Sequence, residues 1–141
     1  MSYLKLIEGQ PEAYSIGQLK RDNPNTSFPD KPSDELLARW GVHPYTLLEP
    51  PAYDRLTQTI VRTAITEVNG AWVQSWTVSD LPAEEASSNV RNRRDALLME
   101  TDWMALSDNT MAPEWMSYRQ SLRDITAQEG FPFSVVWPTK P

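Results

Sequence analysis

The sequence predicts an α+β fold in two parts. Residues 1–79 are expected to form a small proline-rich module with a β-hairpin, and residues 80–141 an antiparallel helical hairpin with a C-terminal extended arm. Three observations carry this prediction: an Asn-Gly pair between two β-prone runs, two helical segments after residue 80, and a short apolar segment closing the chain. A length of 141 residues is that of an ordinary domain and suffices to bury a core.

The composition indicates stiff connections and many large aromatic side chains. The chain has 12 prolines against 5 glycines, and 6 tryptophans. Tryptophan combines a large apolar area with a polar handle, so it is common both in cores and at interfaces. With no cysteine in the chain, a disulfide framework and a thiolate metal site are excluded.

Charge and hydropathy also limit the classes of partner that the protein can have. The net charge of −6 argues against a general nucleic-acid binder, which needs a basic face to displace counterions from phosphates. The basic run at 91–94 is typical of a solvated helix face. The start of the chain has no signal-peptide pattern, and no apolar run approaches the roughly 18 residues of a membrane span. We therefore expect no nucleic-acid partner, no membrane partner and a cytoplasmic protein.

The N-terminal elements follow from local signals. Residues 3–7 alternate and predict a short strand, and residues 15–23 predict one or two helical turns that stop before Pro24, because a residue preceding proline avoids the α region. A helix is expected over 33–40, with Ser33 as its N-cap and Gly41 just past its end. Residues 42–54 are expected to be an extended, proline-punctuated connection.

The hairpin is the clearest local prediction. Asn69-Gly70 lies between the β-prone runs 57–68 and 71–78. An Asn-Gly pair suits a type I′ turn, in which both central residues have positive φ. Trp72 and Trp76 are four residues apart and therefore share one face of the second strand.

Residues 80–106 are predicted to be helical throughout. Asp80 is the expected N-cap, and Pro82 is tolerated in a first turn. Val90, Leu97 and Met104 recur every seven residues, as expected for an apolar stripe that packs on another helix.

A second helix is predicted to begin at Pro113 and to end at Gly130. Its apolar positions form one stripe: Trp115, Tyr118, Leu122 and Ile125. Two helices joined by a short loop should pack antiparallel. Residues 131–137 then read as a short apolar strand or extended arm, and the final prolines block further pairing.

No catalytic constellation emerges, so we expect neither an enzyme nor a bound metal or cofactor. The phosphate-cradling and nucleophile-elbow motifs are missing, and His43 is the chain's single histidine. Nothing in the sequence brings His43 together with a nucleophile and an orienting acid. Asp102, Asp108 and Glu114 flank a helix break, where capping and solvated roles are the usual ones.

A partner-binding surface is the remaining candidate site. Trp, Tyr and Arg dominate interface hot spots, and the apolar arm has a form that can add to a sheet edge. Two alternatives stay open: a core role for the stripe on the second helix, and pairing of the two arginines, which lie on a different face, with acids of the neighbouring helix. The candidate residues are Trp103, Trp115, Tyr118, Arg119, Arg123, Phe131, Phe133, Val135 and Trp137.

The last third of the chain resembles the C-terminal region of tailed-phage tail fibre assembly chaperones and related tail assembly chaperone proteins. The combination of motifs is specific, whereas each alone would be weak. The matching residues are Arg94-Asp95, Leu97-Leu98, Thr101-Asp102-Trp103, Trp115 with Tyr118-Arg119, Leu122-Arg123-Asp124, Trp137-Pro138 and Pro141. One departure is Leu81-Pro82, where the family often opens its first helix with Thr or Ser.

The resemblance implies a non-enzymatic phage tail protein that binds a tail fibre or receptor-binding protein, itself trimeric, and assists its folding, trimerisation or attachment. It implies a location in the host cytoplasm during assembly. Some family members stay on the fibre, so the alternative is a stoichiometric accessory subunit, a cap or adaptor of the fibre or baseplate in the virion tail. An acidic protein with an apolar arm would suit the covering of unpaired strand edges on slowly folding chains.

Overall fold

The structure is a computed structural model that describes residues 2–141, and it divides into two compact units. The first unit consists of the chain up to Ala52 together with Ile60–Thr77. The second consists of Tyr53–Thr59 together with Val78–Pro141. The second unit is therefore assembled from two separate stretches of sequence.

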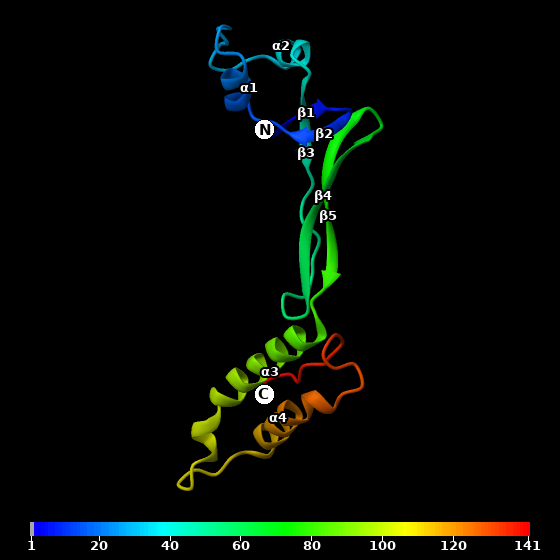
Figure 1. Ribbon diagram of the computed structural model, residues 1–141. Helices are drawn as coiled ribbons and strands as arrows, with labels where there is room; N and C mark the ends of the chain where they lie inside the picture. Colours follow the sequence, from blue (N-terminus) through cyan, green and yellow to red (C-terminus); the bar gives the residue numbers. More distant parts are fainter. Residues whose placement is uncertain (1) are drawn as a thin grey trace. The chain divides into compact units, whose positions relative to one another are not determined.

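A five-stranded mixed sheet organises the first unit, with the strand order β2-β1-β3-β5-β4 (Figure 1). β1 is antiparallel to β2 and β3, while β3 is parallel to β5. The ends of β4 and β5 that lie near residues 58 and 80 are part of the second unit. The strands are β1 (Ser2–Ile7), β2 (Gln10–Ala13), β3 (Val42–Leu47), β4 (Gln58–Val68) and β5 (Ala71–Asp80).

The predicted fold class is wrong. In place of a proline-rich module with one β-hairpin, the chain builds this mixed sheet, and no simple antiparallel helical hairpin follows it. A 3₁₀ helix, η1 (Asp102–Ala105), and a loop separate the last two α-helices. The segment after Gly130 forms turns and coil instead of an extended arm.

The central strand β3 was missed because of its proline. Pro44 is opposite Tyr3 of β1, and the parallel register with β5 begins only at Tyr45, which is opposite Trp72. At Pro44 the strand is thus paired on one side only. A proline without an N–H is compatible with such a locally unpaired edge, whereas a fully central position would lose a ladder bond.

The β1–β2 hairpin was also missed, because its turn lacks the usual residues. Glu8 and Gly9 have φ values of 51° and 82°. Glutamate rarely adopts positive φ, so the Glu-Gly pair gave no hairpin signal. The Asn69-Gly70 turn, with φ values of 52° and 78°, is confirmed.

Two short helices in the first unit confirm the local predictions. α1 (Ile16–Asp22) follows Ser15, whose Oγ accepts a hydrogen bond from the Gln18 amide at 3.0 Å. α2 (Asp34–Arg39) follows Ser33, which accepts from the Leu36 amide at 3.3 Å. Helices of this length are unstable alone, so tertiary packing must hold them.

That packing comes from a small core. Leu19 of α1, Leu37 of α2, Val42 of β3 and Tyr14 form one buried cluster. Phe28 and Trp40 pack against this cluster. Their two rings contact each other edge to face, with centroids 5.2 Å apart. Each short helix thus contributes one leucine that is fully removed from water.

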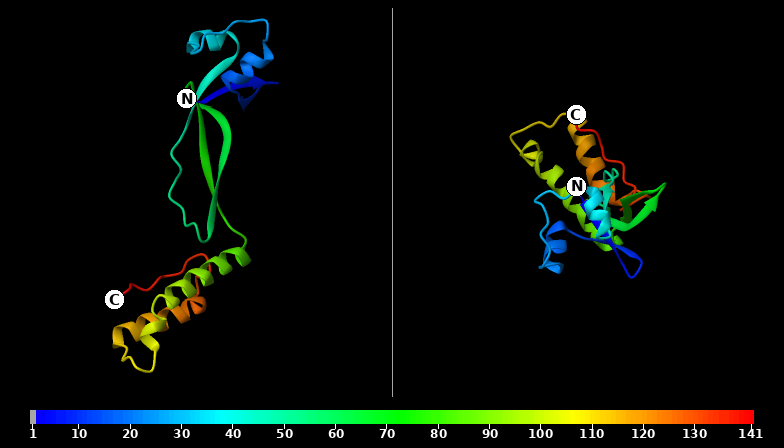
Figure 2. Two further views of the ribbon diagram at one scale, coloured as in Figure 1. Left: turned by 90° about the vertical axis from the view of Figure 1, so that its left-hand side faces the viewer. Right: turned by 90° about the horizontal axis from the view of Figure 1, so that it is seen from above.

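Three helical elements and a coil make up most of the second unit: α3 (Ala83–Met99), α4 (Pro113–Arg123) and the 3₁₀ helix η2 (Asp124–Ala127). α3 and α4 lie side by side in Figure 1 and in the left view of Figure 2. Ala86 and Val90 of α3, and Tyr118, Leu122 and Ile125 of α4 and η2, are buried. Within residues 2–141, no helix combines the length and the apolar character needed to cross a membrane.

Three helix boundaries differ from the predictions. α3 ends at Met99, so residues 80–106 are not one helix. Its N-cap is Pro82, and the carboxylate of Asp80 instead accepts a hydrogen bond from Gln58 Nε2 at 3.1 Å. The second helix begins at Pro113 as predicted, but it ends at Arg123, well before Gly130.

Residues 53–59 join the second unit through hydrogen bonds that their backbone carbonyls accept. The Leu81 amide donates to the Thr57 carbonyl at 2.8 Å, and Asn89 Nδ2 of α3 donates to the Leu56 carbonyl at 3.0 Å. Thr57 is buried, and its hydroxyl donates to Asp54 at 3.1 Å. This segment therefore holds the second turn of α3 and the residues that lead into the helix.

Tyr14 should make stability depend on alkaline pH. Burial raises its pKa from 10.0 to about 12, with further contributions from the hydrogen bond that its hydroxyl donates to Asp22 and from the negative charge of that carboxylate. Between these two pH values the folded state holds a proton that the unfolded state has lost. The stabilisation is therefore complete below pH 10 and disappears as pH rises through about 12.

Urea unfolding at about pH 9 and about pH 11.5 would measure this dependence. Tyr14→Phe is the comparison, because it keeps the ring and removes the titrating hydroxyl. We expect the original protein to lose more unfolding free energy over this interval than Tyr14→Phe does. Equal losses would show that Tyr14 titrates normally.

Gly130→Ala should destabilise the second unit. A Cβ at Gly130 would overlap the backbone carbonyl oxygen of Ser134 and lie 2.9 Å from the Ser134 Cβ. Overpacking of this kind costs about 1–3 kcal/mol, measurable by thermal or urea unfolding. Gly17→Ala is the control: its nearest contacts would be 3.6 and 3.7 Å away, so it should be neutral or slightly stabilising.

Candidate partner-binding site

The candidate site is on the second unit, where α3 ends and α4 passes beside it. Helix α3 stops at Met99, which leaves carbonyl groups of its last turn without partners in the helix. The Thr101 hydroxyl donates to one of these, the Leu98 carbonyl, at 3.1 Å. The rest of the cap comes from a side chain of α4.

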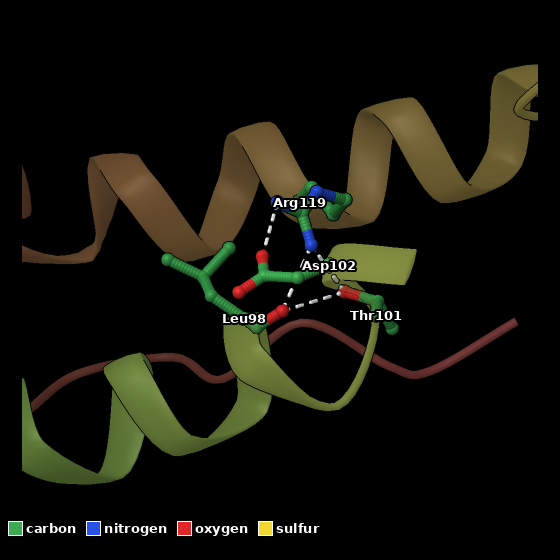
Figure 3. Close-up of polar contacts among 4 residues, drawn as sticks. All are labelled: Leu98, Thr101, Asp102 and Arg119. Atoms are coloured by element: carbon green, nitrogen blue, oxygen red, sulfur yellow. Dashed lines mark hydrogen bonds and ion pairs between the residues drawn. The ribbon is translucent and has the colours of Figure 1, made fainter. Parts of the chain in front are cut away.

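Arg119 supplies that cap (Figure 3). Its Nη1 donates to the Leu98 carbonyl at 2.8 Å and to the Thr101 hydroxyl at 2.5 Å. Its Nη2 donates to the Asp102 carboxylate at 2.9 Å. One guanidinium group thereby joins α4 to the end of α3 and to the start of η1, and we call these four residues the Arg119 cap.

The electrostatics of the Arg119 cap are favourable although the arginine is buried. Its side chain is 8% exposed, whereas that of Asp102 is 62% exposed. The end of a helix carries partial negative charge, so the guanidinium is stabilised by the helix dipole as well as by the carboxylate. Burying the Arg119 guanidinium without partners would be costly; its three hydrogen-bonding partners offset that cost.

The C-terminal coil packs on the helices of the same unit. Gln128 Nε2 donates to the Val136 carbonyl at 2.9 Å, and the Val136 amide donates to Gln128 Oε1 at 2.7 Å. Trp137 and Pro138 line a hollow of about 430 Å³ together with Leu97 and Tyr118. Lys140 Nζ also forms an ion pair with the Glu100 carboxylate at 3.0 Å, so the coil is attached at two points.

Apolar side chains nevertheless remain in contact with solvent on this unit. Val136, Met99, Trp103 and Leu106 are 77%, 71%, 59% and 58% exposed, and these are the highest values among the large apolar side chains described. Three of the four are on the end of α3 and on the segment that follows it. Only Trp103 of these four is among the predicted site residues, because Met99, Leu106 and Val136 are neither aromatic nor arginine residues.

The nine predicted site residues fall into three groups by exposure. Tyr118 and Arg119 are buried, and Tyr118 packs edge to face on Trp115 with ring centroids 5.8 Å apart. Trp103, Arg123 and Phe133 are exposed. The half-buried residues are Trp115, Phe131, Val135 and Trp137.

The residues considered for chemistry do not come together. Asp102 belongs to the Arg119 cap, and His43 is in β3 of the other unit. Among residues 2–141, no three His, Asp or Glu side chains gather in a way that could hold a metal ion.

The segment that carries the Arg119 cap matches the model of a known family. Residues 87–141 match the family model of the phage tail assembly chaperone protein. The resemblance seen in the sequence is thus confirmed over this phage tail assembly chaperone segment, which includes most of α3, all of α4 and the C-terminal coil. Neither the curated proteins nor the solved structures contain a match to the chain.

The phage tail assembly chaperone segment should depend on Arg119 for stability. Arg119→Leu removes three hydrogen bonds from a charged donor and leaves the buried Thr101 hydroxyl with fewer partners. We expect the free energy of unfolding to fall by about 2–4 kcal/mol. Chemical denaturation monitored by tryptophan fluorescence would measure it.

Arg123→Leu is the matched control, because it changes the same residue type one helical turn further along α4 at an exposed position. It should change stability by no more than about 0.5 kcal/mol. Similar losses for both substitutions would contradict a specific capping role for Arg119.

Proposed function

We propose that this protein is a non-enzymatic assembly factor that binds a phage tail fibre or receptor-binding protein, itself trimeric, and assists its folding, trimerisation or attachment. The observation that carries the proposal is the match of residues 87–141 to the phage tail assembly chaperone family. The most exposed large apolar side chains lie within the same residues, which favours a binding role for that segment.

The physical logic concerns the partner's folding. Trimeric β-rich fibres form their strand pairings between chains, so their folding is slow and leaves apolar surface and strand edges exposed. A protein that covers such surface until the trimer is complete lowers the concentration of aggregating species. Its net charge of −6 helps to keep the complex in solution. We place this activity in the host cytoplasm during assembly.

Within the proposed interface, the residues have different roles. Trp103, Arg123 and Phe133 are exposed and can touch a partner directly. Tyr118 and Arg119 are buried and hold the surface in place. Trp115, Phe131, Val135 and Trp137 are half-buried and can contribute part of their area.

Co-expression with the C-terminal half of a tail fibre protein from the same phage tests the function. We expect the fibre fragment to be soluble and trimeric with this protein and aggregated without it, as measured by size-exclusion chromatography with light scattering. Co-elution at a fixed ratio would identify a subunit that stays on the fibre, while soluble trimer alone would identify a transient chaperone. An unchanged fibre fragment would refute the proposal.

Trp103→Ala tests the proposed interface. Since Trp103 is 59% exposed, its loss should change the stability of the protein by less than about 1 kcal/mol. Loss of an interface tryptophan typically costs about 2 kcal/mol or more of binding free energy, roughly 30-fold in Kd. Val61→Ala, at a 55% exposed position of β4, is the control and should bind normally. If Trp103→Ala binds the fibre normally, Trp103 is not part of the interface.

A further inference from the structure

The methionines of this protein are concentrated in one short stretch. Four of the five are Met99, Met104, Met111 and Met116, which span the end of α3, η1, the following loop and the start of α4. Methionine has an unbranched, polarisable side chain that adapts to differently shaped apolar groups, and for this reason it is frequent at promiscuous binding surfaces. A conventional core would distribute such residues along the helices.

Part of this stretch lines a preformed hollow. Ala105, Met111 and Met116 form its apolar wall, and Ser117, Gln120 and two arginines complete a volume of about 440 Å³. Met116 is 51% exposed. The Arg119 cap fixes η1 against α4, so the two sides of the hollow are held together before any partner arrives.

The charge in the hollow is of one sign. Arg119 and Arg123 line it, and no carboxylate does. Arg119 is already engaged by Thr101 and Asp102. Arg123 is exposed and forms no side-chain hydrogen bond or ion pair with any residue from 2 to 141. A protein with net charge −6 thus presents an unpaired cation beside an apolar wall.

The complementary ligand is an apolar group next to a carboxylate. A large aliphatic or aromatic side chain would be desolvated against Met111 and Met116, and a neighbouring Asp or Glu would form a charge-assisted bond with Arg123. Nucleic acid is a poor candidate, since one free arginine on an acidic protein cannot replace the counterions of several phosphates.

We propose that the hollow between η1 and α4 binds a segment of the partner polypeptide in which a large apolar side chain adjoins an Asp or Glu. This inference rests on the proposed function and specifies the chemistry that the tail protein partner must present. The hollow accepts varied apolar shapes through methionine, while Arg123 selects segments by charge.

The test uses the full-length protein labelled with ¹³C at its methionine methyl groups. The probes are two amphipathic peptides with blocked ends, alike in their Leu and Phe positions and differing only in one Glu or Lys. We expect the Glu peptide to shift the Met111 and Met116 signals more than that of Met99, which does not line the hollow. We expect the Lys peptide to bind roughly five-fold or more weakly, as for one partly exposed ion pair.

Charge reversal sharpens the test. Arg123→Glu should invert the preference, so that the Lys peptide binds more tightly than the Glu peptide. Arg55→Glu is the matched control, because it makes the same change of net charge at an exposed arginine outside the hollow, and the Glu preference should persist. The proposal is overturned if Met99 shifts as much as Met111 and Met116, if no methionine signal moves, or if Arg123→Glu leaves the preference unchanged.

The fibre assay separates this proposal from the proposed function. A double variant, Met116→Ala with Arg123→Glu, that assists the fibre as well as the original protein would refute the hollow as the binding site while leaving the assembly role intact. Conversely, if the original protein has no effect on the fibre but the peptide preference is found and inverts, the hollow is supported and the partner must be sought elsewhere.

Discussion

The second unit depends on a single buried guanidinium group. Arg119 closes the end of α3 by bonding to the Leu98 carbonyl, engages the Thr101 hydroxyl and pairs with Asp102. Without it, the Leu98 carbonyl would keep its bonds from Thr101, but no side chain of α4 would reach the end of α3 or the carboxylate of Asp102. The exposed side chains of Met99 and Trp103 are next to the residues that this contact joins. A stabilising interaction thus also determines the form of the candidate binding surface.

Local signals in the sequence were sufficient to predict an element where a single residue determines the backbone conformation at that point. Ser15 and Ser33 cap helices, Pro113 begins one, and Asn69-Gly70 turns a hairpin, since each acts on groups within a few residues. The sheet could not be predicted in the same way. Pro44 argues against a central strand. It is compatible with β3 only because the pairing of β3 with β5 begins at the next residue, Tyr45, and the partner of Tyr45 is nearly thirty positions away in the sequence.

The candidate site shows the same division between local and distant causes. Aromatic and arginine residues identified the right region, but helical spacing could not tell the buried Arg119 from the exposed Arg123, four residues later. The difference arises from Leu98 and Thr101, which are distant in sequence. The methionine-lined hollow had no signal in any motif. It becomes visible only when α3 is known to stop at Met99, which places η1 beside α4.

The participation of residues 53–59 in the second unit bears on how such proteins exchange parts. The phage tail assembly chaperone segment begins at residue 87, inside α3, whereas the folded unit also includes a stretch that precedes the β4–β5 hairpin. Recombination at residue 87 would keep Leu81 and the first residues of α3 but replace Asn89, whose side chain must then still reach the retained Leu56 carbonyl. The segment that matches the family is therefore smaller than the folded unit that contains it. A transferred segment would remain compatible with its new chain only where the turn before β4 presents a carbonyl that can receive it.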